Sequence, residues 1–331
     1  TRKHFSTSYE LSPREKMIVL KKIQEYVDFA LLHLSGGEPL MCPEFFDIIK
    51  HADKRKISIS FFTNGTLIEK YKKKLKEIPK ENVHAVYVSL LGITDEAHKS
   101  IRGESLQRSL SGIRLLIEMG FPVEISFNLY KGNFHQMEDA VRFCISNGIK
   151  SITFHLIDNK GRAMDMMEDF EFLSLRDRAI FLRKIQYLQS KYGDKIIIKN
   201  TLDPVLEFRK KQEYLDILSR INYSCDAFDP LKIQIDPKGD VHICYEMGLI
   251  TRDFYIGNIV SDEITEIINR KKEKISSLSN IMRPVCKTCI LRPMCKGACL
   301  VQAVQGNVKF FLRNCLKNID RLYEETLFKS V

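Results

Sequence analysis

The chain has 331 residues, of which 44% are hydrophobic and 28% are charged, and its formal net charge is +10. This length suffices for one large domain with a smaller one, and the composition excludes a disordered or collagen-like chain. No apolar run approaches the roughly 20 residues that span a bilayer, and no signal peptide opens the sequence. The basic residues are dispersed, which argues against a nucleic-acid partner. We therefore expect a cytoplasmic protein with neither a membrane nor a nucleic-acid partner.

Helices and strands alternate along the first half of the chain. A capping box at Ser12–Glu15, with Pro13 at the first helical position, predicts a helix start. Buried strands are expected at Phe29–Leu34, Ile57–Thr63, Val83–Leu90, Val123–Leu129 and Ser151–Leu156. Helices are expected at about Pro43–Lys54, from about Leu67, at Leu106–Met119 and at His135–Asn147. This alternation predicts a parallel sheet of βαβ units, in which ligands lie at the carboxyl ends of the strands.

The second half changes character twice. From about residue 160 to 220 the pattern is mainly helical, and a hairpin is then expected at Leu231–Asp236 and Asp240–Cys244. A cysteine-rich segment and a final helix at about Leu316–Leu327 follow. We therefore expect two domains, residues 1–220 and residues 221–331.

Cysteine is distributed unevenly. Seven of the nine cysteines lie between Cys225 and Cys315, and only Cys42 and Cys144 precede them. Such a density in a large chain of cytosolic type indicates metal binding rather than disulfides. Cys144 lies on an apolar helix face and is expected to be a small core residue, and no role is assigned to Cys42.

Glycine and polar residues follow one predicted strand after another. Gly36, Gly37, Glu38 and Pro39 follow the first strand, where two glycines let a ligand approach the backbone closely. Taken alone, this segment is equally well explained as a turn before a helix. Further polar positions at or just after strand ends are Asn64, Ser89, His98, Arg102, Asn128 and Arg162. Their recurrence favours a shared ligand site over separate turns.

With these residues, the sequence resembles the radical S-adenosylmethionine (SAM) superfamily over essentially its whole length. The resemblance implies an α/β fold, a partial (β/α)6 TIM-like barrel that binds SAM at the strand ends. It assigns Gly36, Gly37, Glu38 and Pro39 to the segment that holds the methionine amino group. It places Ser89, Asn128 and Arg162 near the ribose or carboxylate of SAM, and makes Asn64 and Arg102 structural supports.

The C-terminal cysteines carry a second resemblance. Their spacing, C-x2-C-x5-C-x3-C followed at a distance by one more cysteine, resembles the SPASM domain of peptide-modifying radical SAM enzymes. That family binds auxiliary [4Fe-4S] clusters in a small cysteine-rich domain, and soft thiolate ligands fit zinc or iron–sulfur. The resemblance assigns one cluster to Cys286, Cys289, Cys295 and Cys315, and the other to Cys225, Cys244 and Cys299. The second set has three cysteines, which leaves an open iron or an unidentified fourth ligand.

One element of the family pattern is not found. The C-x3-C-x2-C loop that holds the SAM-binding cluster would follow the first barrel strand, and the sequence reads as starting near the end of that loop. Only five strands are recognised, one fewer than the six of the barrel. A degenerate homologue without radical chemistry would also lack the loop. Because the downstream motifs are intact, we expect this cluster to be held by residues outside the chain, immediately before Thr1.

The family resemblance also implies a function. We expect a radical SAM oxidoreductase that generates a 5′-deoxyadenosyl radical and introduces a thioether or carbon–carbon crosslink into a ribosomally made precursor peptide. Its electron donor would be a flavodoxin or ferredoxin. A sulfatase-type maturase that makes formylglycine is the nearest alternative, and a non-catalytic iron–sulfur or zinc module is another. No general base is identified, and His33 and His155 are interpreted as structural histidines with satisfied hydrogen bonds.

Overall fold

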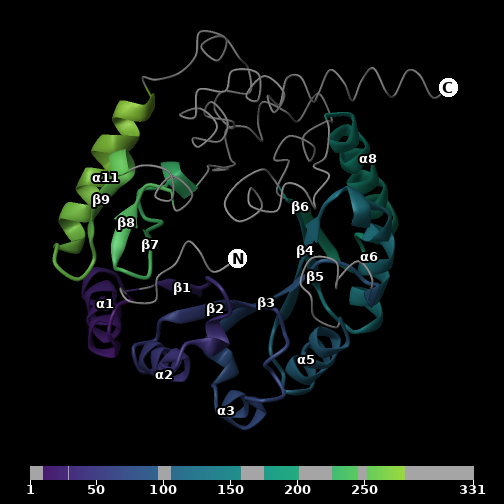
Figure 1. The fold of residues 1–331 in the computed structure, drawn as a ribbon, viewed down its shortest axis with the longest axis horizontal. Coiled ribbons are helices and arrows are strands. Elements are labelled where there is room, and N and C mark those ends of the chain that lie inside the picture. Colours follow the sequence, from purple (N-terminus) through teal and green to yellow (C-terminus); the bar gives the residue numbers. More distant parts are fainter. Residues whose placement is uncertain are drawn as a thin grey trace.

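A parallel sheet of six strands forms the larger part of the described structure (Figure 1). The computed structural model describes residues 10–28, 30–95, 106–157, 175–200, 226–244 and 252–279. The strands follow chain order and are β1 (Leu31–Leu34), β2 (Ser58–Thr63), β3 (Val83–Leu90), β4 (Val123–Leu129), β5 (Ser151–Leu156) and β6 (Ile197–Asn200). Every neighbouring pair is parallel. The expected α/β barrel-type sheet is therefore confirmed.

Helices cover the convex side of this sheet (Figure 1). They are α2 (Phe45–Lys54), α3 (Lys72–Lys76), α5 (Leu106–Glu118), α6 (Met137–Ser146) and α8 (Leu175–Tyr192). Alternate strand residues point toward them, such as Phe61, Val88 and Phe127, which are buried in one hydrophobic cluster with residues of the helices. The opposite face of the strands is polar, with Ser60, Tyr87, Ser89, Ser126 and Asn128 in alternating positions. One face thus builds the core and the other is available for polar ligands.

The strand predictions were accurate where the apolar run was long and uninterrupted. The bounds of β3, β4 and β5 match the expectation, whereas β1 is shorter than predicted and Phe29 lies outside the described residues. β6 was missed, and the count of five strands was wrong. Ile196 and Ile198 are buried while Ile197 is 59% exposed, so this short isoleucine run alternates as a strand does, but it was included in a segment expected to be mainly helical. The missing-strand argument based on that count therefore fails, and the position of the cluster loop stays a prediction.

A small antiparallel sheet forms the second unit. It contains β7 (Gln234–Ile235), β8 (Asp240–His242) and β9 (Tyr255–Asn258), and α11 (Ile264–Ser279) packs on it. The predicted hairpin is confirmed, with Gly239 at φ +82° in its turn. A second hydrophobic cluster fills this unit. We call β7–β9 with α11 the C-terminal module; the expected domain boundary near residue 220 lies outside the described residues.

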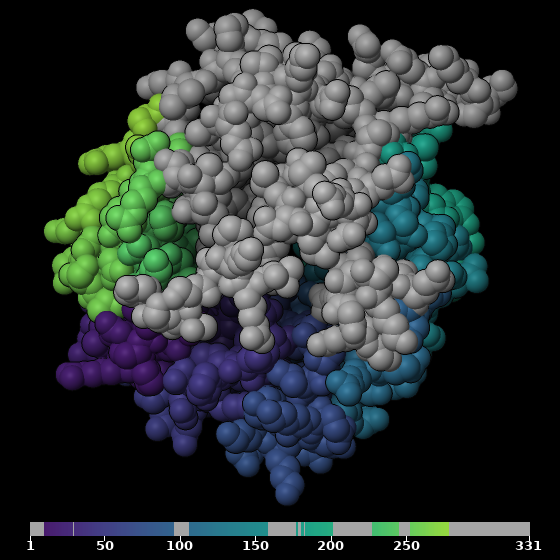
Figure 2. All heavy atoms as spheres, in the orientation of Figure 1, coloured from purple at the N-terminus to yellow at the C-terminus, as the bar shows by residue number. Residues whose placement is uncertain are grey.

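The first helix, α1 (Pro13–Tyr26), packs on the C-terminal module (Figures 1 and 2). The predicted capping box is present, because the Ser12 side chain accepts from the Glu15 amide and Glu15 accepts from the Ser12 amide. Val19, on the buried face of the helix, belongs to the hydrophobic cluster of the module. A salt bridge of 2.8 Å from Lys16 to Glu44 ties the same helix to the segment before α2. α1 therefore bridges the two units.

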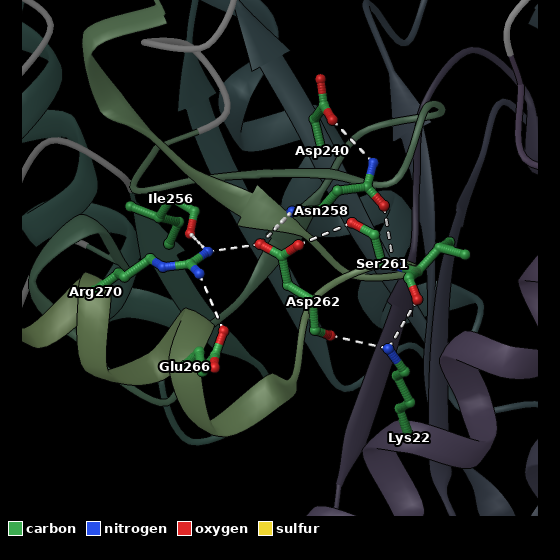
Figure 3. A network of polar contacts seen from close by, with 9 residues as sticks. Lys22, Asp240, Ile256, Asn258, Ser261, Asp262, Glu266 and Arg270 are labelled. Carbon is green, nitrogen blue, oxygen red and sulfur yellow. Dashed lines mark hydrogen bonds and ion pairs between the residues drawn. The ribbon is translucent and has the colours of Figure 1, made fainter.

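Lys22 anchors α1 to a polar network in the module (Figure 3). Its ammonium donates to the backbone carbonyls of Val260, at 2.8 Å, and Asp262, at 2.9 Å. The Asp262 carboxylate in turn accepts from Arg270 at 2.6 Å, which fixes α11 against the turn after β9.

Within the described ranges, no helix combines the length and the apolar character that crossing a membrane requires.

Glu138 joins α6 to α8 and gives a first prediction. Its carboxylate accepts from Lys191 at 2.9 Å, Lys184 at 3.1 Å, Tyr192 at 2.9 Å and Arg142 at 3.2 Å. These donors, Lys191 first, lower the pKa of Glu138 to about 2 from 4.5. Its ionised form therefore contributes stability above pH 4.5 that is lost as the pH falls toward 2.

We expect Glu138→Gln to destabilise the protein by about 1 kcal/mol at neutral pH, since several of the donors are partly exposed to solvent. Urea unfolding at pH 7 and at pH 3 should show a smaller difference between variant and wild type at the lower pH. Glu118→Gln is the control, because Glu118 is exposed on α5 and makes no hydrogen bond or ion pair among the described residues. Equal losses in the two variants would contradict this role for Glu138.

Candidate functional site

The loop after β1 forms an open cradle. Gly36 has φ +133°, a conformation that favours glycine, and Gly36 and Gly37 are both exposed. A Cβ atom built on either glycine would meet no other atom within 4 Å. The backbone of this loop is therefore accessible to a ligand, and a side chain here would occupy the space in front of it.

Glu38 connects this loop to the end of the next strand. One carboxylate oxygen accepts from the Thr63 hydroxyl at 2.9 Å and from the Leu40 amide at 3.3 Å. The other accepts from the Asn64 amide at 2.7 Å. Two of these donors belong to the strand-end segment of β2, so Glu38 fixes the position of the β1 loop relative to β2.

The loop after β2 is held from the other side by α5. Gly65 has φ +80°, and a Cβ on Gly112 of α5 would lie 2.1 Å from the Gly65 carbonyl oxygen. The helix backbone thus packs directly on the loop. Asn64 shapes the same turn, because its side-chain oxygen accepts from the amide and the hydroxyl of Thr66, at 2.9 and 2.7 Å. Its predicted structural role agrees with this geometry.

Ser89, Asn128 and His155 lie on the polar face of the sheet near the carboxyl ends of β3, β4 and β5. Ser89 pairs in register with Ser126, and Asn128 pairs with His155. The side chains of Ser89, Asn128 and His155 are all half-buried. Burial lowers the pKa of His155, which favours the neutral ring. The interpretation of His155 as a structural histidine stays a prediction.

His33 also departs from its expected environment. It is exposed on β1 rather than buried, and its ring lies 6.5 Å from that of Tyr87. Tyr87 stacks on Phe62 at 4.6 Å, and its pKa is raised by burial and by the charge of Glu124. Glu124 in turn pairs with Lys199 of β6 at 3.1 Å. The polar face thus also carries an aromatic stack and an ion pair.

Two buried amides, which the sequence did not reveal, hold the loops after β3 and β4. Asn133 donates to the carbonyls of Leu91, at 3.0 Å, and Asn128, at 2.8 Å. Gln136 accepts from the amide of Ile93 at 2.7 Å. Both side chains are almost fully buried, although they lie in a segment of polar appearance. The Leu91 carbonyl and the Ile93 amide lie 42 and 43 residues from Asn133 and Gln136, so no local pattern could have indicated these two bonds.

Cysteine positions are described only in part. Cys244 follows β8, is half-buried and forms no disulfide. Cys144 is fully buried in the core, as expected, and burial raises the pKa of its thiol. Burial, with a hydrogen bond to Glu44, also raises the pKa of Cys42, which disfavours a reactive thiolate. The remaining predicted ligands, together with His98, Arg102 and Arg162, lie outside the described residues: Cys225, Cys286, Cys289, Cys295, Cys299 and Cys315.

Comparison with known families accounts for this arrangement. Residues 2–158 match the radical SAM superfamily, and residues 228–290 match the iron–sulfur cluster-binding domain called SPASM. The chain contains a radical SAM domain followed by an SPASM domain. The cradle and the polar sheet face belong to the first domain, and Cys244 with β7–β9 belongs to the second.

Several curated proteins are similar in sequence. The Bacillus subtilis subtilosin biosynthesis protein AlbA is 24% identical over 238 residues, which are 71% of this chain and 48% of AlbA. A probable GTP 3′,8-cyclase of Methanococcus aeolicus is 30% identical over 54% of this chain and 63% of its own length. The mycofactocin maturase MftC of Mycobacterium tuberculosis is 24% identical over 88% of this chain and 71% of MftC. The chain thus spans about half of AlbA and under two thirds of the cyclase.

Solved structures show the same fold. Streptococcus suis SuiB bound to SAM superposes with a TM-score of 0.72 at 17% identity, covering 89% of this chain and 67% of SuiB. The structure of anSMEcpe with bound SAM gives a TM-score of 0.66 at 19% identity, covering 95% and 90% of the two chains. At these identities the likeness establishes the fold and no more.

The two domains imply SAM and [4Fe-4S] clusters as cofactors. The described residues fit this requirement in two places. Because Gly36 and Gly37 have no side chain, the backbone groups of the glycine cradle are open to a ligand. Cys244 offers a half-buried thiol that no disulfide engages. The individual contacts assigned by the sequence stay predictions.

Gly37 provides a direct test of the cradle. Its backbone is not in the left-handed region and its Cβ position is open, so Gly37→Val is expected to fold normally. The branched side chain would fill the ligand space, and we expect SAM affinity in calorimetry to fall about tenfold or more. Unchanged melting temperature is the accompanying control. Unchanged SAM affinity would exclude this loop from the binding site.

Gly112 tests the support beneath the site. Gly112→Ala places a methyl group 2.1 Å from the Gly65 carbonyl oxygen, far closer than a Cβ contact allows. The clash outweighs the gain of about 1 kcal/mol in helix propensity, and we expect a net destabilisation of about 1–3 kcal/mol. Ser111→Ala, on the exposed side of the same helix, should change the free energy of unfolding little. Equal stability of the two variants in urea unfolding would show that the loop tolerates displacement.

Proposed function

We propose that the protein is a radical SAM maturase that crosslinks a ribosomally made precursor peptide. The observation that carries the proposal is the combination of a SAM-type cradle with a C-terminal SPASM module in one chain. AlbA and MftC are named for bacteriocin biosynthesis and mycofactocin maturation. SuiB has been solved with its precursor peptide SuiA, and anSMEcpe with peptides.

Sequence coverage favours peptide maturation over nucleotide chemistry. The match to MftC extends over 88% of this chain, whereas the matches to the GTP cyclases cover between 52% and 71% of it. The C-terminal module is therefore better accounted for by the maturase. A formylglycine-forming maturase, the nearest alternative implied by the family resemblance, is the second candidate.

The chain's own residues would position the reactants. We propose that Gly36 and Gly37 present backbone groups to the methionine amino group of SAM and that Glu38 keeps their loop in place through Thr63 and Asn64. Ser89 and Asn128, on the polar face, would contact the ribose or carboxylate, together with Arg162. When bound, SAM and a reduced [4Fe-4S] cluster supply a 5′-deoxyadenosyl radical, and the protein orients the peptide beside it.

The auxiliary clusters would be held in the C-terminal part of the chain. We propose Cys244, with Cys225 and Cys299, for one cluster and Cys286, Cys289, Cys295 and Cys315 for the other. An iron site with an open coordination position would suit a thiolate of the peptide. A flavodoxin or ferredoxin is the proposed electron donor.

Anaerobic turnover of the natural full-length protein tests this proposal. With SAM and dithionite we expect 5′-deoxyadenosine by liquid chromatography, and iron and sulfide in the purified protein. With the peptide encoded beside its gene, we expect the mass to fall by the two hydrogens that a crosslink removes. Gly37→Val should form less 5′-deoxyadenosine than the wild type at limiting SAM, because its SAM affinity is expected to be weaker.

The outcomes separate the candidates. Absence of 5′-deoxyadenosine, or zinc in place of iron, would refute the catalytic proposal in favour of a binding module. Conversion of GTP rather than the peptide would identify a cyclase. Conversion of a cysteine or serine residue to an aldehyde, without a crosslink, would identify the formylglycine alternative.

A further inference from the structure

Three metal-ligating side chains converge on the β7–β8 hairpin, apart from the cysteines. One potential ligand atom each of Asp236, Asp240 and His242 lies within 4.8 Å of the others. Val241 and Ile243, which alternate with them, are fully buried in the core of the C-terminal module. Strand alternation therefore places Asp240 and His242 together on the face opposite that core.

Each carboxylate has one oxygen already fixed. Oδ1 of Asp236 accepts from the amides of Lys238, at 2.8 Å, and Asp240, at 2.9 Å. Oδ1 of Asp240 accepts from the side-chain amide of Asn258 at 2.9 Å. These bonds orient the carboxylates and leave each Oδ2 without such a partner. Metal-binding carboxylates are commonly held in this way, with one oxygen fixed by a neighbouring donor.

His242 supplies an independent observation. It is 7% exposed, and its Nδ1 has no hydrogen-bond partner. Its Nε2 lies 4.0 Å from Oδ2 of Asp236, too far for a hydrogen bond, so the ring is turned toward the carboxylate without bonding to it. Buried polar groups in proteins are nearly always paired, and an ion or water accounts for many of the exceptions.

We propose that Asp236, Asp240 and His242 bind a first-row divalent metal ion such as Mn²⁺ or Zn²⁺, separately from the iron–sulfur clusters. Two carboxylates balance the charge of the ion, and a mixed oxygen and imidazole set suits these metals rather than an iron–sulfur cluster. The ligand atoms must each move inward by about 1 Å to reach bonds of 2.0–2.2 Å, and water would complete the coordination.

The ion would have a structural role in the C-terminal module. It would join the two strands of the hairpin and, through Asn258, the end of β9. Arg252 is the competing cation, since its guanidinium lies 4.0 Å from Oδ2 of Asp240. Its side chain is 88% exposed and can turn away when the metal enters.

Titration with Mn²⁺ tests the proposal in the anaerobic, cluster-loaded protein. Mn²⁺ has little affinity for thiolates, and oxidised [4Fe-4S] clusters are diamagnetic, so the electron paramagnetic resonance signal of free Mn²⁺ reports binding directly. We expect one bound ion for the wild type and an affinity at least about 10-fold weaker for Asp236→Asn. Asparagine keeps the Oδ1 acceptor of the turn and replaces only the proposed ligand oxygen.

Two further variants test whether a change in Mn²⁺ affinity is specific to the three proposed ligands. Asp229→Asn is the matched control, because Oδ1 of Asp229 also accepts from a turn amide, that of Leu231 at 3.0 Å, outside the triad. Its Mn²⁺ affinity should equal that of the wild type. Arg252→Ala should bind Mn²⁺ more tightly than the wild type.

Either of two results would overturn the proposal. No bound Mn²⁺ in the wild type, or equal affinity in the wild type and Asp236→Asn, would show that the triad is only a turn and an unbonded histidine. Melting curves recorded without Mn²⁺ will show whether Asp236→Asn is folded. Addition of Mn²⁺ should then raise the melting temperature of the wild type and of Asp229→Asn, but not that of Asp236→Asn.

Discussion

The carboxylate of Glu38 is the constraint on which the candidate site depends. A parallel sheet aligns the carboxyl ends of its strands at one edge, but the loops that leave those ends are free to diverge. Glu38 prevents this for β1 and β2, because its two oxygens bind the Thr63 hydroxyl and the Asn64 amide of the neighbouring strand end. An open glycine loop would otherwise lose conformational entropy each time it bound a ligand. Fixing it beforehand lowers that cost, which is the physical meaning of preorganisation.

Other loops at the carboxyl edge of the sheet are also held in place, by contacts of a different kind. Asn133 and Gln136 connect the segments after β3 and β4 through backbone groups, and Gly112 presses α5 onto the loop after β2. Each contact uses a buried polar group or the absence of a side chain. The helix-covered face of the sheet needs neither, because Phe61, Val88 and Phe127 pack there by size alone. The apolar core and the polar side chains thus lie on opposite faces of the same strands.

Sequence reasoning succeeded where the signal was local. Continuous apolar runs predicted β3 to β5, because strand period is a property of neighbouring residues. It failed for β6, whose short Ile196–Ile198 run was included in a segment expected to be helical, and for the bond of Asn133 to Leu91, which lies 42 residues away. It also placed His33 in a buried strand although its side chain is exposed, since alternation places a side chain on a face without stating what covers that face.

The attachment of α1 has a consequence for biosynthesis. Lys22 reaches carbonyl groups 238 and 240 residues further along the chain, and Val19 completes a cluster built mainly from the C-terminal module. Lys22 of α1 is therefore synthesised 238 residues before Val260, and the apolar face of the helix is covered only after the module has been made. Contacts of such sequence separation slow folding and leave apolar surface exposed on the nascent chain. Packing of α1 onto the C-terminal module therefore has to follow synthesis of that module.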